Sequence, residues 1–228
     1  MIKQDLGERM KRYESITQSK LIPHMPTIIR IDGKTFHSYV KYVNASKPFS
    51  DKLHNIMTST MVYLCRDLIQ NAVFGYTQSD EISILLKDWP NFNTDQWFSG
   101  KVQKITSVSA SGASAYFNTY HEFENAKALA IFDARVFQLP VEEICNYFIW
   151  RQQDAIRNSI QSFGQVYFSH KQLNKVTCNQ IKEMIYDKTG LTWEHLPGWQ
   201  KNGSAIKEEL DEDVPIFSTD RTYIEMLY

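Results

Sequence analysis

The amino-acid sequence predicts an α+β protein with an antiparallel sheet of the split βαβ, ferredoxin-like kind and helices packed against it. Apolar runs of strand length alternate with helical periodicity in the order strand, helix, hairpin, helix, strand, helix. The 228 residues are 43% hydrophobic, which is enough for one large domain or a domain with a smaller appendage. Because an antiparallel sheet can carry its helices on one face, we expect the other face to be free for a site.

The first half of the sequence supplies the first three strands. Residues 1–22 have the pattern of a charged amphipathic helix, and the apolar run 26–33 is typical of a strand between a proline and a glycine. Residues 49–72 are predicted to form a helix capped by Ser50. A hairpin follows, with strands expected over 72–77 and 81–87.

The second half adds a strand and three helices. Small residues at helical spacing predict a helix over 101–121, and the apolar run 128–140 predicts the last strand. A long helix follows Pro140 and is expected to end near Gly164, and another is expected over about 171–188. We divide the chain into a main domain that contains the sheet and the N-terminal helix, residues 1–165, and a helical or loop extension packed on it, residues 166–228.

Composition and charge limit the function classes. The formal net charge is −1, so any binding of nucleic acid has to depend on a local basic patch. The three cysteines are isolated, which argues against a zinc knuckle and against a disulfide framework. Neither an apolar signal core nor a run of about 18 apolar residues is present, so we expect a cytoplasmic protein without a membrane span.

Two acidic positions are the first candidates for chemistry. Asp32 ends the first predicted strand, and Asp80 with Glu81 lies at the predicted hairpin tip. A split βαβ sheet makes these strands neighbours, so two carboxylates can meet and hold Mg²⁺, although turn chemistry is the simpler explanation of either acidic stretch taken alone. Because adjacent strand residues point to opposite faces, we expect Asp80 to be the ligand and Glu81 to support it.

Basic residues near the acids are candidates for phosphate contacts. Lys34, His37 and Lys47 are placed to meet a triphosphate, and each is also compatible with a solvated loop. Arg135 is a lone charge in an apolar strand and needs a carboxylate or phosphate partner.

The helical spacing after residue 150 gathers a second polar group. Roughly one side of the predicted helix carries Arg151, Asp154, Arg157 and Asn158. This side either pairs with RNA phosphates or is a solvated face with internal charge pairs.

Five motifs carry a family resemblance. They are RIDGKTFHSY, ASKPF, GYTQSDEISILL, FDARVFQLP and WRQQDAIRNSI, within residues 26–165. Their order and form resemble the tRNA-His guanylyltransferase superfamily, whose patterns are R-I/L-D-G-x-x-F-H, K-P, G-Q-S-D-E, F-D-G/A-R-V and W-R-Q-x-D. The resemblance implies a polymerase-palm-like core that uses two Mg²⁺ ions to add nucleotides, 3′ to 5′, onto the 5′ end of tRNA.

The resemblance also implies roles for individual residues. Asp32 and Asp80 would bind metal with the Gly33 carbonyl, and Glu81 would complete the catalytic acids. The expected nucleotide contacts are Asp32, Gly33, Lys34, Thr35, Phe36, His37, Lys47, Ser79 and Asp80. Arg135 would contact phosphate or tRNA, and the polar side of the predicted helix adds Arg151, Arg157 and Asn158 as expected RNA contacts. Expected substrates are GTP or another nucleoside triphosphate, ATP, and the 5′ end and acceptor stem of tRNA, and the expected assembly is a homotetramer.

One departure from the family pattern bears on specificity. Enzymes dedicated to tRNA-His carry His-Ile-Asn-Asn after W-R-Q-x-D-C, where this chain has Ile156, Arg157, Asn158 and Ser159. The resemblance therefore favours the guanylyltransferase-like proteins, which repair 5′-truncated tRNA by templated addition. The alternatives are a tRNA-His guanylyltransferase that adds a single G, a palm-type nucleotide cyclase, and a non-catalytic RNA-binding module.

Overall fold

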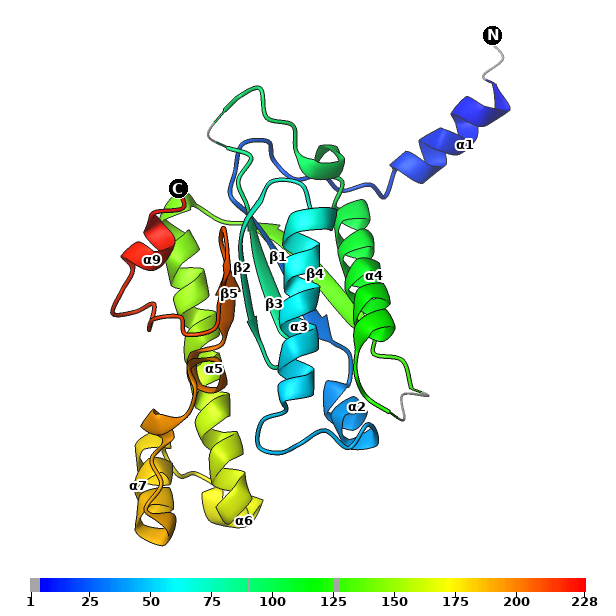
Figure 1. Ribbon diagram of the computed structural model, residues 1–228. Coiled ribbons are helices and arrows are strands. Elements are labelled where there is room, and N and C mark those ends of the chain that lie inside the picture. Colours follow the sequence, from blue (N-terminus) through cyan, green and yellow to red (C-terminus); the bar gives the residue numbers. More distant parts are fainter. Residues whose placement is uncertain (1–4, 90, 125–127) are drawn as a thin grey trace.

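The computed structural model describes residues 5–89, 91–124 and 128–228 (Figure 1). The first half contains α1 (Leu6–Ser15), β1 (Thr27–Gly33), α2 (Phe36–Tyr42), α3 (Asp51–Tyr63), β2 (Ala72–Gln78) and β3 (Glu81–Leu86). The second half begins with α4 (Val102–Tyr120), β4 (Phe132–Gln138) and α5 (Ile144–Tyr167). It ends with α6 (His170–Leu173), α7 (Cys178–Thr189), α8 (Gly198–Asn202), β5 (Ser204–Ile206), β6 (Leu210–Asp211) and α9 (Thr222–Glu225).

The sheet confirms the predicted fold class. Its strand order is β4-β1-β3-β2-β5-β6, and every neighbouring pair is antiparallel. The first four strands have the split βαβ order. The C-terminal segment was expected to contain only helices and loops, and this is wrong for β5 and β6, which extend the sheet beside β2.

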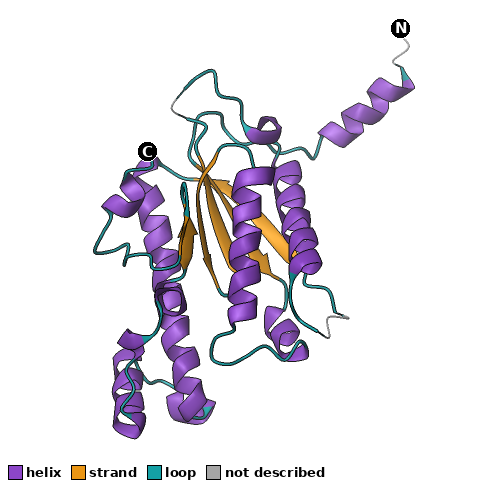
Figure 2. Cartoon of the chain, viewed as in Figure 1, coloured by secondary structure: helices purple, strands orange, loops and turns teal. Residues whose placement is uncertain are grey.

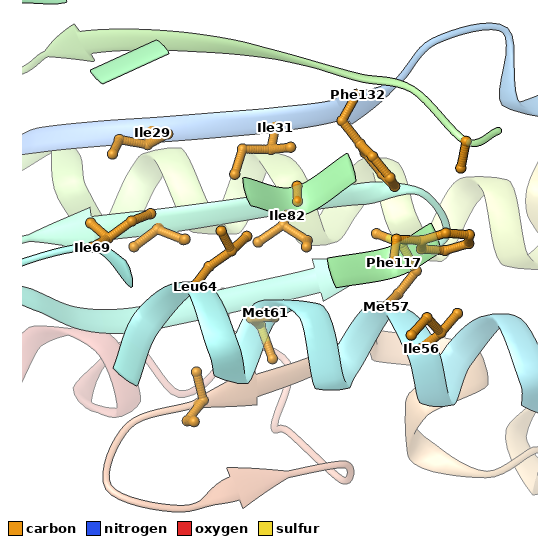
Figure 3. Packing of buried hydrophobic residues seen from close by; sticks show 14 of the residues in the cluster. Ile29, Ile31, Ile56, Met57, Met61, Leu64, Ile69, Ile82, Phe117 and Phe132 are labelled. Carbon is orange, nitrogen blue, oxygen red and sulfur yellow. The ribbon is translucent and has the colours of Figure 1, made fainter. Parts of the chain in front are cut away.

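Helices cover both faces of the sheet (Figure 2). On one face, α3 and α4 pack over Ile29, Ile31 and Ile82 in the largest apolar cluster (Figure 3). On the other face, α5 packs through Phe148 against Phe74 and other residues of a second cluster. The expectation that this second face is free is therefore wrong over much of its area, because α5 and the C-terminal segment cover it.

Local packing and capping explain where the predicted helices differ from the observed ones. The Ser50 hydroxyl accepts a hydrogen bond from the backbone N–H of Leu53, which confirms the expected cap of α3. Helix α5 continues past Gly164 to Tyr167, and a Cβ at Gly164 would lie 2.7 Å from Ile181 of α7, so this glycine permits close helix packing. The single helix expected over 171–188 is divided into α6 and α7, each of which begins with a capping box.

Residues 1–4 of the amphipathic helix expected over 1–22 lie outside the described residues. Of the remainder, α1 covers residues 6–15, and it has no buried residue. Within the described residues, the structure contains no helix with the length and hydropathy needed to cross a bilayer.

Candidate active site

The end of β1 and the β2–β3 hairpin bring the predicted acids together. In the β1–β3 pairing, Asp32 lies opposite Glu81. The backbone N–H of Gly33 donates to the carbonyl of Asp80 at 3.1 Å. Ser79 and Asp80 form the two-residue connection between the strands, and Ser79 adopts a left-handed φ of 57°. All three carboxylates line one cleft.

The expected division between Asp80 and Glu81 has a different physical basis from the one the sequence suggested. Strand alternation does not separate them, because Asp80 lies in the turn and both side chains line the cleft. Their partners differ instead. The Glu81 carboxylate accepts a hydrogen bond from Arg151 Nη1 at 2.8 Å and lies 3.9 Å from Arg30 Nε. The Asp80 carboxylate accepts from the Ser79 hydroxyl at 3.0 Å.

The surroundings of Asp80 disfavour the ionised form of its carboxylate. Burial raises the pKa of Asp80 and the neighbouring charge of Asp32 raises it further, while the hydrogen bond from Ser79 opposes both effects. A divalent cation between the two acids would remove this repulsion, and carboxylate oxygens are ligands that Mg²⁺ prefers. Residues 5–89, 91–124 and 128–228 contain no group of three or more His, Cys, Asp or Glu side chains that could hold a metal ion. Any Mg²⁺ held by Asp32 and Asp80 therefore needs further oxygens from backbone, phosphate or water.

Gly33 is required by the close packing around these acids. A Cβ at this position would lie 2.9 Å from a carboxylate oxygen of Asp80 and 2.3 Å from the Phe36 ring. The sequence suggested that this glycine allows a ligand to approach, and the structure shows that it allows the site's own acid and core to approach.

The acids line a cleft of about 760 Å³, a volume typical of small-molecule sites. Its walls come from β1, α2, the segment before α3, α3, the β2–β3 hairpin, α5 and α8. Among the predicted contacts, the cleft is lined by Asp32, His37, Lys47, Ser79, Asp80, Glu81, Arg151 and Asn158. An aromatic group closes another part, where His54 and Trp199 stack with ring centroids 4.1 Å apart.

Other predicted nucleotide contacts lie outside this lining. Phe36 is buried in the core between Tyr39, Phe117 and Phe132, so its side chain cannot touch a ligand. Thr35 is exposed and adopts a left-handed φ of 51° just before α2. Lys34 is exposed, but its backbone N–H already donates to Ile131 at 2.7 Å, so a phosphate contact would have to use the side chain.

The predicted RNA contacts separate into buried and exposed residues. The Arg151 side chain is only 8% exposed and is paired with Glu81 and Asp154, so the expectation that it shares an open basic surface with Arg157 is wrong. Arg157 is 62% exposed and pairs with Asp154. Arg135 is 57% exposed and finds its expected carboxylate partner in Asp133 at 3.7 Å.

Arg30 had no predicted role, although it lies on the same face of β1 as Asp32 and 3.9 Å from its carboxylate. The signal was available, because Arg30 interrupts an apolar strand in the same way as Arg135, its partner across β1 and β4. The stacking of Trp199 on His54 had no such signal, because it joins α8 to α3 across the fold.

Comparisons with known proteins agree with this architecture. A family model described as tRNAHis guanylyltransferase (Thg1) matches residues 7–140. The tRNA(His) guanylyltransferase of Saccharomyces cerevisiae is 25% identical, over 83% of this chain and 85% of its own length. An uncharacterized mimivirus protein, R259 of Acanthamoeba polyphaga mimivirus, is 28% identical over 92% of this chain and 79% of its own.

Solved structures extend the likeness over nearly the whole chain. A bacterial tRNA(His) guanylyltransferase (Thg1)-like protein in complex with ATP is 43% identical with a TM-score of 0.93, covering 98% of this chain and 99% of that one. A bacterial Thg1-like protein in complex with GTP is 40% identical with a TM-score of 0.83 over the same shares. The yeast enzyme's structure, at 22% identity and a TM-score of 0.76 over 92% of this chain and 97% of that one, shares the fold.

Proposed function

This chain belongs to the tRNAHis guanylyltransferase family and is a nucleotidyltransferase, and we propose that it repairs 5′-truncated tRNA by templated 3′-to-5′ addition. The observation that carries the proposal is the meeting of Asp32 and Asp80 in the lining of a nucleotide-sized cleft. This placement supports the palm-like core that the sequence motifs imply. In this proposal GTP or another nucleoside triphosphate is the incoming substrate, ATP activates the RNA, and the enzyme assembles as a homotetramer.

Asp32 and Asp80, with the Gly33 carbonyl, would hold two Mg²⁺ ions. Two partly buried carboxylates whose charges repel fit that role. Bound there, Mg²⁺ would supply positive charge to the attacking and leaving oxygens of phosphoryl transfer. Glu81 is already neutralised by Arg151 and Arg30, so its role is to fix these arginines beside the acids.

The proposed reaction joins the two substrates at the acids. The 3′-oxygen of the nucleoside triphosphate bonds to the 5′-phosphorus of the RNA, and its proton passes to water. The bond from that phosphorus to the leaving group breaks. The leaving group is pyrophosphate if the RNA carries a 5′-triphosphate, or AMP if ATP has first activated a monophosphate. Lys47 and His37, which line the same cleft, would donate hydrogen bonds to the phosphate oxygens of the incoming triphosphate.

Two observations favour templated repair over single-G addition. The residues aligned with the His-Ile-Asn-Asn pattern are Ile156, Arg157, Asn158 and Ser159, so only one asparagine is kept. Identity to the bacterial Thg1-like protein is 43%, against 25% to the yeast tRNA(His) enzyme. The ATP and GTP complexes of the Thg1-like proteins support the same nucleotides as substrates here.

A 5′-extension assay tests the proposal. Labelled tRNA lacking its first nucleotide is incubated with Mg²⁺, ATP and each nucleoside triphosphate in turn, while the base opposite the gap is varied. We expect the added nucleotide to follow that base. Addition of G whatever the opposing base would instead support the tRNA-His activity. Absence of tRNA binding in a gel shift would favour a cyclase acting on small molecules.

A further inference from the structure

Trp150 is a large aromatic side chain that the proposed chemistry does not use. It lies on α5 next to Arg151, and 52% of it is exposed. The guanidinium carbon of Arg151 lies 3.7 Å from the centre of the Trp150 ring, and Tyr147, one turn earlier, contacts the ring edge-on at 6.0 Å. The indole is therefore braced by its neighbours while about half of its surface stays open, as in residues that bind through a ring face.

Trp150 is connected directly to the acids. Arg151, which covers the ring, donates to Glu81 at 2.8 Å, and Glu81 lies opposite Asp32 in the sheet. Arg151 forms part of the cleft wall, whereas Trp150 does not. The indole thus lies behind the wall of the nucleotide cleft, outside the space that an incoming triphosphate would fill.

The reaction needs a second nucleotide at this border. The 5′-phosphorus of the RNA has to reach Asp32 while the triphosphate occupies the cleft, so the first RNA base must lie outside the cleft. An open indole with an arginine on its other face suits a nucleobase, because base–aromatic stacking tolerates any base and gains from a neighbouring cation. Tolerance of any base is also what repair of different tRNA ends requires.

We propose that Trp150 stacks on the base of the 5′-terminal nucleotide of the RNA, with Arg151 as the residue that positions the ring. The inference rests on the proposed function, since it takes RNA as the substrate. It assigns a binding role to a side chain outside the cleft and leaves the triphosphate contacts unchanged.

A coupling experiment tests this assignment without requiring catalysis. Affinity is measured for a truncated tRNA and for the same tRNA with an abasic 5′-terminal nucleotide, using wild type, Trp150→Leu and Trp150→Phe. We expect Trp150→Leu to weaken binding of the intact tRNA by about tenfold, and the abasic change to weaken wild-type binding by about as much. The two losses should not add, because both remove the same stack. Trp150→Phe keeps a ring and should retain most of the affinity.

Affinity for GTP and thermal unfolding serve as controls and should be unchanged in Trp150→Leu. Additive losses, or full affinity in Trp150→Leu, would overturn the assignment even if nucleotide addition proceeds normally. A change of assembly mass in Trp150→Leu would also overturn it, by placing the indole between copies of the chain. If the two losses are not additive but wild type adds no nucleotide, the stack is supported and the proposed reaction is refuted. Failure of wild type to bind the tRNA would overturn both.

Discussion

On β1, Ile29 and Ile31 point into the core beneath α3 and α4, whereas Arg30 and Asp32 point to the opposite face. The same division continues on β3, where Ile82 and Ile84 belong to the core. Glu81 and Ser83 belong to the polar face, and the Ser83 hydroxyl is 2.8 Å from that of Tyr147 on α5. Farther along the same two strands, Ile28 and Leu85 return this face to an apolar cluster, the one beneath α5. Near the hairpin, two neighbouring strands thus carry an apolar face and a polar face.

The difference between the two faces separates stability from chemistry at the level of single residues. Strand alternation places each group one residue from a group of the other kind. Two helices cover the apolar face. Helix α5 covers the opposite face only in part, so a cleft remains beside the acids. Substitutions one position apart should therefore have opposite consequences for folding and for activity.

The largest effect is expected on the polar face, at the acids. Asp32→Ala or Asp80→Ala should lower nucleotide addition about 1,000-fold or more, because a lost metal ligand removes several kcal/mol of charge stabilisation from the transition state. Stability without Mg²⁺ should hold or rise, since burial and the charge of Asp32 raise the pKa of Asp80 and so make its ionised form costly near neutral pH. Addition rate and thermal unfolding are measured on the same preparations.

A matched control for these acids is Asp133→Ala, which removes a carboxylate from the neighbouring strand in register with Asp32. Asp133 does not line the cleft, so this variant should keep most of the activity. Near-normal addition in Asp32→Ala or Asp80→Ala would contradict the two-metal mechanism. Unfolding of either variant would show that the acids serve to form the turn.

The second effect is expected on the apolar face, one residue from Glu81. Ile82 is fully buried beneath α3 and α4, so Ile82→Ala should lower the free energy of unfolding by about 3 kcal/mol. Activity per folded molecule should stay close to wild type. Denaturant unfolding and the addition rate at low temperature measure the two quantities. Loss of activity without loss of stability would mean that the two faces are not independent.

The placement of the acids, the fold class and most element positions were predictable because they depend on local pattern. The split βαβ order follows from element succession, and that order by itself makes Asp32 and the hairpin tip neighbours. Capping boxes at Ser169 and Thr177 were also present in the sequence, and they mark the division into α6 and α7 that periodicity alone missed.

The remaining features depend on tertiary contacts that a sequence pattern does not specify. Strands β5 and β6 have three and two residues, too few to show alternation, and they exist because β2 offers an edge. Helical spacing grouped Arg151 with Arg157 but could not say which of them faces the sheet. Burial of Arg151 follows from its pairing with Glu81, on a strand 70 residues away.

A smaller effect is expected from the ion pair that joins the polar face to α5. Glu81→Gln leaves Arg151 and Arg30 together without their shared counter-charge, so stability should fall by about 2 kcal/mol, less than for a fully buried pair because Glu81 is partly exposed. The test is a double-mutant cycle with Arg151→Met, measured by denaturant unfolding. In the double variant much of the loss should be recovered. Purely additive losses would show that the 2.8 Å contact contributes nothing.

The smallest effect is expected at Arg157, on the solvent side of the same helix. Its side chain is exposed and already paired with Asp154, so Arg157→Gln should change stability by less than about 0.5 kcal/mol. If Arg157 contacts one RNA phosphate, as we expect, the slope of log affinity against log salt should become less steep by about 0.9. Affinity for tRNA is measured over a salt series, with Lys11→Gln on the distant α1 as a charge-matched control that should leave the slope unchanged.

GTP affinity of Arg157→Gln should be unaffected, because Arg157 lies outside the cleft lining. Identical slopes for wild type and Arg157→Gln would show that this side of α5 only faces solvent, and the RNA would then have to be held by Arg135 and the residues around the acids.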